Sequence, residues 1–316
     1  MAVTLAQAKL NVTDDLQIGI IDEFAKSSFI LNNIPFHDCV SPVGGGATLT
    51  YGYTRLITQP TADFRAVNSE YTPHEVQKQR YTTDLKVFGG AYEIDRIIAG
   101  MGGIADEVTL QASQKVKAAS ALFSDTIING DSATNPLVFD GLDVAITGTA
   151  TEYTPGTVID LSTTEAVDAN YKVFIDQFDE WLSELDGADA YLCNSKMLAK
   201  FRAIARRAGQ YQETKNEFGQ KVEWFGGVPF VDLGAKAGSN DPIVGIGADG
   251  TTSIYAVRFG LDGFHAISMA GQAPIKTWLP DFTTAGAVKK GEFEMVAGCA
   301  LKSTKAAGAF RKIKVQ

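Results

Sequence analysis

A single helical pattern from Ile104 to Asn129 constrains this chain more than any other feature. Its apolar and small residues recur at steps of three and four, which puts them on one stripe of an α-helix: Ile104, Val108, Ala112, Val116, Ala119, Phe123 and Ile127. Acidic residues occupy the first turn and Gly130 follows the last apolar residue, so both ends carry helix boundary signals. A helix of roughly 26 residues is about 39 Å long. We expect it to be a backbone on which other parts of the chain are mounted.

The composition is that of a folded protein with a large core. The chain has 316 residues, 45% of them hydrophobic and 21% charged, and this length favours one large or two to three modest domains. The first residues show no signal peptide, and no apolar run is long enough to cross a membrane. Cys39, Cys193 and Cys299 are far apart and odd in number, which favours reduced thiols in a cytoplasmic setting.

The charge of the chain argues against general nucleic-acid binding. A net charge of -9 and a pI near 4.9 leave no broad positive face for phosphate groups. Two local basic clusters stand out, Lys196, Lys200, Arg202, Arg206 and Arg207 in one, and Lys302, Lys305, Arg311, Lys312 and Lys314 in the other. For both clusters we favour ion pairs or a solvated face over phosphate contact.

The N-terminal region, residues 1–46, has the character of an arm. A capping signal at residues 13–15 precedes a short amphipathic stretch that includes Leu16 and Phe24, and two prolines and three glycines follow. So little local core means that the arm must lie against something else. A core-forming N-terminal helix is the alternative interpretation.

Residues 47–94 contain two β-rich runs with interleaved apolar and polar residues, ATLTYGYTRLI and QKQRYTTDLKVFGGAYEI. The segment that joins them, residues 58–76, is polar and lacks glycine. A two-stranded ribbon that is polar on both faces contributes little to an internal core. We therefore predict one long two-stranded arm that becomes buried on a partner, with a surface β-meander as the alternative.

The middle of the chain predicts a mixed α+β domain at about residues 155–275. Its features are a helix at about 164–185 with solvated acidic residues, a buried strand at AYLCN, a basic helix capped by Asn194 and Ser195, and a hairpin through Gly226 and Gly227. Further strands are predicted at IVGIG, SIYAVRFG and GFHAISM. Two more, EFEMVAGCALKST and AAGAFRKIKV, are predicted to end the chain.

No motif of a known active site is present. Gly245 to Gly250 fits a dinucleotide loop, but a strand pattern follows where a helix is needed, so we interpret it as a turn. The sequence has no phosphate loop, nucleophile elbow, zinc-protease helix or paired cysteines. His37, His74 and His265 are far apart and lack further ligands at metal-binding spacing. We therefore predict a protein that is not an enzyme and has no cofactor and no metal site.

Four stretches of the sequence resemble the major capsid proteins of tailed bacteriophages, whose shell fold is named after phage Hong Kong 97. They are DDLQIGIIDEFAKSSFILNNIPF, PTADFRAVNSEYT, INGDSATNPLVFDGL and KKGEFEMVAGCALKSTKAAGAFRKI. The resemblance covers nearly the whole chain in the order of the family, and the combination is specific although no single motif is. It implies an α+β, Hong Kong 97-like fold.

The resemblance also implies a division of the chain into an N-terminal arm (1–46), an extended β-hairpin loop (47–94), a peripheral domain around the spine helix (95–150 with 276–316) and a mixed axial domain (151–275). In this family each extended loop lies over a neighbouring subunit, and axial domains meet at five-fold and six-fold axes. Within the loop, the candidates for contact between subunits are Phe64, Arg65, Asn68, Glu70 and Tyr71.

The function implied by the resemblance is self-assembly, through hexamers and pentamers, into the icosahedral head that encloses double-stranded DNA without reading its sequence. The implied partners are further copies of the chain, a portal protein and a separate scaffolding protein, because the arm begins within a dozen residues of Met1. A decoration protein is left open. Non-covalent stabilisation is expected, because neither Lys78 nor Lys86 could be matched to a lysine–asparagine cross-link site. The implied location is the virion, and the host cytoplasm during assembly.

Two other functions are considered beside the phage capsid. An encapsulin-type compartment shell shares the fold and holds cargo enzymes in place of a genome. A soluble α+β hydrolase with an unrecognised site belongs to a different class.

Overall fold

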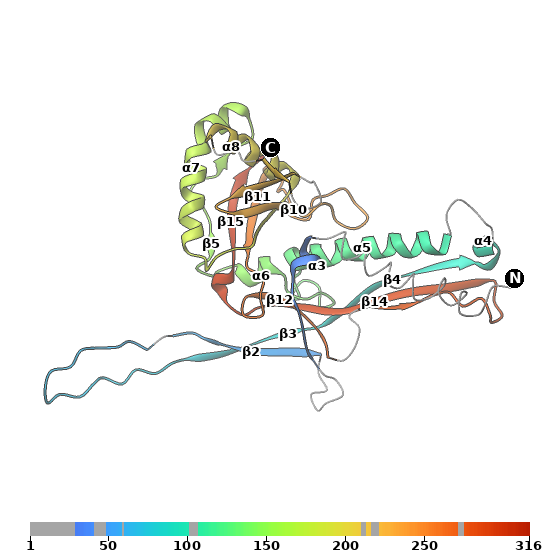
Figure 1. Ribbon diagram of the computed structural model, residues 1–316, viewed down its shortest axis with the longest axis horizontal. Coiled ribbons are helices and arrows are strands. Elements are labelled where there is room, and N and C mark those ends of the chain that lie inside the picture. Colours follow the sequence, from blue (N-terminus) through green and yellow to red (C-terminus); the bar gives the residue numbers. More distant parts are fainter. Residues whose placement is uncertain are drawn as a thin grey trace.

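The computed structural model describes residues 29–40, 49–58, 60–100, 107–209, 213–215, 221–270 and 275–316. The helix predicted near Leu16, and most of the predicted arm with it, lies outside the described residues. The described chain forms two sheets with their covering helices, and a two-stranded ribbon that projects from them (Figure 1).

The predicted spine helix is confirmed as α5, Glu107–Asn129, from the point where the description begins. Its apolar stripe is buried, with Ala112, Val116, Ala119, Phe123 and Ile127 each at most 4% exposed. Figure 1 shows the helix running along strands β4 (Lys86–Asp95) and β14 (Val288–Leu301). The buried side chains of the helix, which recur every three to four residues, therefore pack against side chains that alternate along the strands.

The sheet beneath α5 has the order β1-β12-β14-β13, and β4 also pairs with β14. The remaining bounds are Phe36–Val40 for β1, Phe264–Met269 for β12 and Ile275–Trp278 for β13. Alternate residues of β14, Phe293, Met295, Ala297 and Cys299, belong to the same buried cluster as the α5 stripe. Two short helices flank this layer, α3 (Phe29–Asn33) and α4 (Arg96–Gly100).

The second sheet has eight strands in the order β5-β15-β11-β7-β10-β9-β8, with β6 also paired to β15. The bounds are Glu152–Tyr153 (β5), Ile159–Asp160 (β6), Ala190–Cys193 (β7), Glu213–Lys215 (β8), Lys221–Phe225 (β9), Val228–Asp232 (β10), Thr251–Val257 (β11) and Ala307–Lys314 (β15). Helices α7 (Thr164–Ser183) and α8 (Ser195–Arg207) pack on this sheet, and both confirm predicted helices. The Asn194 side chain accepts a hydrogen bond from the Met197 amide at 2.9 Å, as predicted for the cap of α8.

An aromatic cluster forms the core of this second unit. Phe174, Phe178 and Trp181 of α7 lie with their ring centroids 5.7 to 5.9 Å from Phe310 of β15. The buried Trp181 indole donates a hydrogen bond to the Thr151 carbonyl at 3.0 Å, so its one polar group is satisfied.

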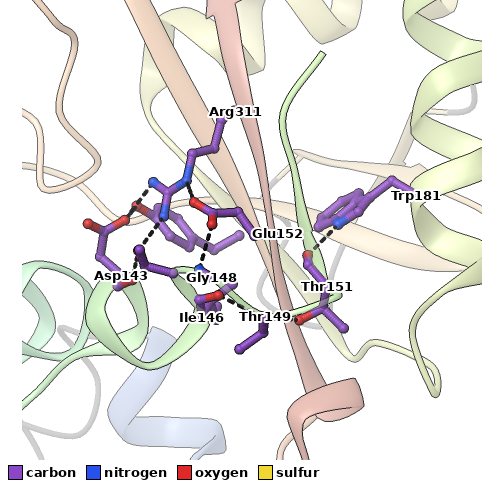
Figure 2. Close-up of polar contacts among 10 residues, drawn as sticks. Asp143, Ile146, Gly148, Thr149, Thr151, Glu152, Trp181 and Arg311 are labelled. Carbon is purple, nitrogen blue, oxygen red and sulfur yellow. Dashed lines mark hydrogen bonds and ion pairs between the residues drawn. The ribbon is translucent and has the colours of Figure 1, made fainter. Parts of the chain in front are cut away.

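A polar network links the two units at helix α6, Leu142–Ile146 (Figure 2). Arg311 of β15 donates to the Asp143 carboxylate at 2.7 Å and also pairs with Glu152. The Tyr255 hydroxyl donates to the same Asp143 oxygen at 2.7 Å. Burial, together with this hydrogen bond, raises the pKa of Tyr255 above its usual range, so the hydroxyl stays protonated and remains a donor.

The predicted ribbon is longer than the observed one. Strands β2 (Thr50–Leu56) and β3 (Lys78–Asp84) pair with each other, but β4 leaves the ribbon and pairs with β14 along its length. The change occurs at Leu85, which is 3% exposed, and continues where Tyr92 and Ile94 are buried. The sequence alternates on both sides of Leu85, and only burial distinguishes the two strands.

The strand predicted at IVGIG is wrong. Residues 243–247 are irregular, although Ile243 and Val244 are buried. Their carbonyl groups accept hydrogen bonds from the Asn129 and Asn194 side chains, at 2.7 and 3.0 Å. Side-chain amides therefore replace the ladder that a strand would need. The following glycines form the predicted turn, in which the Gly250 amide donates to the Gly247 carbonyl and strand β11 follows.

The two sheets are not built from continuous segments of the chain. Strand β12, within the predicted axial segment, lies in the five-stranded sheet, whereas β15, within the predicted peripheral segment, lies in the eight-stranded sheet. The short helix Thr304–Ala306 turns the chain from one sheet to the other between β14 and β15. Both predicted terminal strands are confirmed, but the sequence pattern of a strand does not show which other strand it pairs with.

Candidate assembly surface on the projecting ribbon

The ribbon of β2 and β3 extends well beyond the body of the protein (Figure 1). Its register runs from Thr50 opposite Asp84 to Leu56 opposite Lys78. Because side chains alternate along a strand, one face carries an aromatic row: the Tyr51 and Tyr53 rings and the Tyr53 and Tyr81 rings each stack at 5.9 Å.

The aromatic row is fixed to the body along the paired strands of the ribbon. The Tyr53 hydroxyl donates to the Leu301 carbonyl at 2.9 Å, and Arg55 donates to the Lys302 carbonyl at 2.9 Å. The Arg55 guanidinium also lies 4.3 Å from the centre of the Tyr81 ring. Burial raises the pKa of Tyr53, although Arg55 opposes the shift, so the hydroxyl remains a donor at neutral pH.

The tip of the ribbon has a defined shape of its own. The Ser69 amide and hydroxyl both donate to the Ala66 carbonyl, at 3.2 and 2.9 Å, and Arg65 donates to the Ser69 carbonyl at 3.1 Å. Asn68 has a φ of 69°, a left-handed conformation that asparagine tolerates better than most residues. These contacts form a compact turn without support from the rest of the subunit.

The structure places all five predicted contact residues on this tip. Phe64 has a relative exposure of 108% and Tyr71 one of 61%, while Arg65 lies over the Tyr71 ring with 5.3 Å to its centre. Asn68 forms the turn, and Glu70 is exposed. Val67 of the same tip was not predicted as a contact residue, and it is 89% exposed. Its signal was an apolar residue inside an otherwise polar connection.

Several apolar side chains of the ribbon keep a large exposed surface within one subunit. Leu56, Ile57 and Val76, nearer the body, are 63%, 49% and 40% exposed. An ordered projection that holds several apolar side chains in solvent is typical of a surface that becomes covered by a protein partner.

The other candidate sites offer little chemistry. Among the described residues, no group of three His, Cys, Asp or Glu side chains could hold a metal ion, and no described helix is long and apolar enough to span a membrane. A pocket of about 590 Å³ lies between α7, α8 and the hairpin of β9 and β10, lined by Phe201, Ile204 and Trp224 among other apolar residues. None of the described residues that line it is titratable.

The two basic clusters take part in ion pairs within the subunit. Arg202 pairs with Glu223, and Arg207 pairs with Asp168. In the C-terminal cluster, Arg311 belongs to the network of Figure 2. These contacts support the interpretation of structural ion pairs. The thiols of Cys193 and Cys299 are buried, and burial raises the pKa of both above the usual range, which leaves them unreactive.

Comparison with known proteins identifies the fold. No protein-family model and no curated protein matches the sequence. Among solved structures, the SrpI encapsulin complex from Synechococcus elongatus PCC 7942 matches with a TM-score of 0.62 at 13% identity, over 100% of this chain and 98% of that one.

Phage-like capsids match over similar lengths. The capsid of a native GTA particle has a TM-score of 0.60 at 13% identity, over 91% of this chain and 90% of that one. The mature capsid of bacteriophage PhiM1 has a TM-score of 0.55 at 12% identity, over 90% and 86%. Sequence identities this low do not show that the proteins share a function. Structural similarity over nearly the whole of each chain does establish that they share an architecture. The chain therefore has the α+β, Hong Kong 97-like capsid fold.

Proposed function

We propose that this protein is a major capsid protein, which self-assembles through hexamers and pentamers into the icosahedral head of a tailed phage around double-stranded DNA. The observation that carries the proposal is the ordered ribbon tip, whose Phe64 and Val67 side chains are 108% and 89% exposed. An enzyme needs no such projection, whereas a shell subunit gains from it at every copy.

The ribbon would bind a neighbouring copy through a preformed tip. Because the turn is already fixed by the Arg65 and Ser69 hydrogen bonds, little conformational entropy is lost when it docks. Phe64 and Val67 would act as apolar anchors, and Arg65, Asn68, Glu70 and Tyr71 as the surrounding contacts. Repetition by symmetry then converts modest interfaces into a stable shell.

The proposal also assigns a separate role to each of the two units of the subunit. The unit around α5 would form the peripheral domain, and the eight-stranded unit would form the axial domain that meets its copies at five-fold and six-fold axes. Strand β15 and helix α6, joined by Arg311 and Asp143, would hold the two units in one orientation. The function requires no catalytic step, and the partners would be a portal protein, a separate scaffolding protein and packaged DNA.

An encapsulin-type shell is the second candidate, because the SrpI complex matches over the whole chain. The two functions share a fold and differ in contents. Purified particles that hold nuclease-protected DNA support the capsid, and particles that hold a protein cargo without DNA support the compartment.

Removing the ribbon tip tests the proposal. Residues 60–75 would be replaced by Gly-Gly, which leaves the closing hydrogen bond from the Ile57 amide to the Gln77 carbonyl within reach. We expect a subunit that keeps its helical circular dichroism and melting temperature but forms no closed particles by negative-stain microscopy and light scattering.

A matched control separates the shape of the tip from its length. An equally long Gly/Ser segment in place of residues 60–75 keeps the reach but removes the anchors and the turn, so it should also fail to close shells. Normal particles from either variant would contradict the assigned role of the ribbon.

A further inference from the structure

A buried histidine lies where the ribbon joins the body. His265 of β12 has no exposed surface, and among the described residues neither ring nitrogen makes a well-aligned hydrogen bond, although the Gly263 carbonyl attracts its proton. Next to it, at 5.8 Å between ring centroids, lies His37 of β1, whose buried Nδ1 also lacks a hydrogen bond within the described part of the chain. Buried polar atoms in folded proteins nearly always have partners, so this pair requires an explanation.

The histidine pair supports the first residues of the ribbon. The Tyr51 ring of β2 stands edge-on to both imidazoles, with centroids 5.8 Å from His37 and 6.1 Å from His265. Tyr51 stacks on Tyr53, whose hydroxyl binds the Leu301 carbonyl. The ribbon root is therefore seated on two imidazoles that are uncharged only while they carry one proton each.

The charges around His265 oppose its protonation. Lys302, which follows β14, lies on the same side, with its Nζ 5.7 Å from the centre of the Tyr51 ring. The acid that faces the site is Asp262, and it pairs with Arg258 at 3.0 Å. Asp38 of β1 is bonded to the Ser268 hydroxyl. A protonated His265 would thus meet a second imidazole and a lysine, while the carboxylate of Asp262 is already paired with Arg258.

Burial is the main cause that lowers the pKa of His265, from 6.5 to about 4. The Lys302 charge and His37 act in the same direction, and the Gly263 carbonyl and Asp262 oppose them. The imidazole is consequently neutral at pH 7 while the root is closed.

We propose that His265 and His37 act as a proton-operated release for the ribbon, in which a proton on the pair separates the root from the five-stranded sheet and frees the ribbon to change direction. Water that enters the open root solvates the charge, and the Tyr53 hydrogen bond to Leu301 is lost with it. This release would occur in a single subunit and does not depend on the proposed function. The further consequence, that the ribbons of a shell reorient on acidification, rests on the proposed function.

The pH window follows from linkage between protonation and opening. In the open root His265 titrates near 6.5, and in the closed root near 4. Between these values the open form binds a proton that the closed form rejects, so the open population rises as pH falls through this window. The full difference of about 2.5 pH units corresponds to roughly a 300-fold change in the opening equilibrium.

Hydrogen–deuterium exchange of the unassembled full chain tests the release. Exchange would be measured from pH 7.5 to 4.5, and each peptide would be corrected for its intrinsic rate. We expect residues 50–56 and 78–84 to lose at least tenfold protection, while the β11 and β15 peptides keep theirs. Loss of protection in all peptides together would mean acid unfolding and would overturn the proposal, as would no change at the ribbon.

The matched variant is His265→Phe. A phenyl ring of similar size keeps the packing under Tyr51 and removes the titration. We expect this variant to hold its ribbon protection down to pH 4.5, and a wild-type pH response in it would rule out His265 as the trigger.

A second measurement covers the case in which the variant does not fold. The three histidines of the wild-type chain can be titrated by NMR through ¹³C-labelled Cε1 atoms. We expect one of them to stay neutral until the ribbon peptides lose protection. Three histidines that all titrate near 6.5 with the ribbon still protected would also overturn the release. None of these results depends on whether shells form, so they leave the proposed function to its own test.

Discussion

The ribbon and the eight-stranded unit differ in how far their aromatic side chains are exposed. In the eight-stranded unit, Phe174, Phe178 and Phe310 are at most 1% exposed and pack on one another. On the ribbon, Phe64 and Tyr71 stand in solvent. The first group stabilises a single subunit through burial, and the second can contribute only when another molecule covers it.

The two regions also differ in what holds their shape. The ribbon tip keeps its shape through hydrogen bonds such as that from Arg65 to Ser69, which do not require a hydrophobic core. Under the proposed function, single apolar side chains spread along a thin projection would limit the apolar area that a subunit exposes before assembly.

Truncation of the core should have the largest effect on the free energy of unfolding. Phe178→Ala removes a fully buried ring that contacts Trp181, Tyr191 and Phe310, and we expect a loss of about 3 to 5 kcal/mol. Urea unfolding followed by circular dichroism measures it. Phe178→Leu, which keeps most of the volume, is the control and should lose less. A loss below about 1 kcal/mol for the alanine variant would mean that the eight-stranded unit is not held by this cluster.

Breaking the network of Figure 2 should have an intermediate effect. Arg311→Met leaves the half-buried carboxylates of Asp143 and Glu152 without their cation, and we expect a loss of about 1 to 3 kcal/mol in the free energy of unfolding.

The charge-preserving variant Arg311→Lys is the control for this network. It keeps the cation but cannot bind both carboxylates through a planar fork, so its loss should be smaller. Equal losses in the two variants would show that the positive charge alone does not stabilise the junction, and that the forked hydrogen bonds of the guanidinium do.

Substitution at the ribbon tip should have the smallest effect on the subunit. Phe64→Ser changes an exposed side chain, so the free energy of unfolding should stay within about 0.5 kcal/mol of the wild type. Particle formation, measured by light scattering, should nevertheless fall at least tenfold. Val173→Ala, at an apolar position of α7 that is 45% exposed, is the control and should leave assembly unchanged. A subunit destabilised by Phe64→Ser would place the tip in the monomer core and remove the contrast.

Local signals in the sequence were sufficient for the three long helices, α5, α7 and α8, and for one hairpin. The stripe of α5 is set by spacing alone. Thr163 accepts a hydrogen bond from the Ala166 amide at the start of α7, a cap that a threonine before a helical pattern predicts. Gly226 and Gly227 have φ values of 58° and 83°, which a tight turn between β9 and β10 requires and which glycine adopts without strain.

The candidate site was predicted in part. The polar connection at 58–76 indicated a projection, and the resemblance to capsid proteins selected Phe64, Arg65, Asn68, Glu70 and Tyr71 within it. That Arg65 and Asn68 form the turn, while Phe64 extends away from it, depends on backbone angles and hydrogen bonds that composition does not encode.

Sequence by itself determined the three long helices, most of the extended segments and the turn at Gly226 and Gly227, because these properties depend on neighbours within a few residues along the chain. Tertiary structure alone decided that β4 leaves the ribbon, that β14 and β15 enter different sheets, and that His37 and His265 meet beneath Tyr51. The physical reason is that strand pairing and burial are contacts between segments that can be hundreds of residues apart, and alternation along one strand is the same whichever partner it finds.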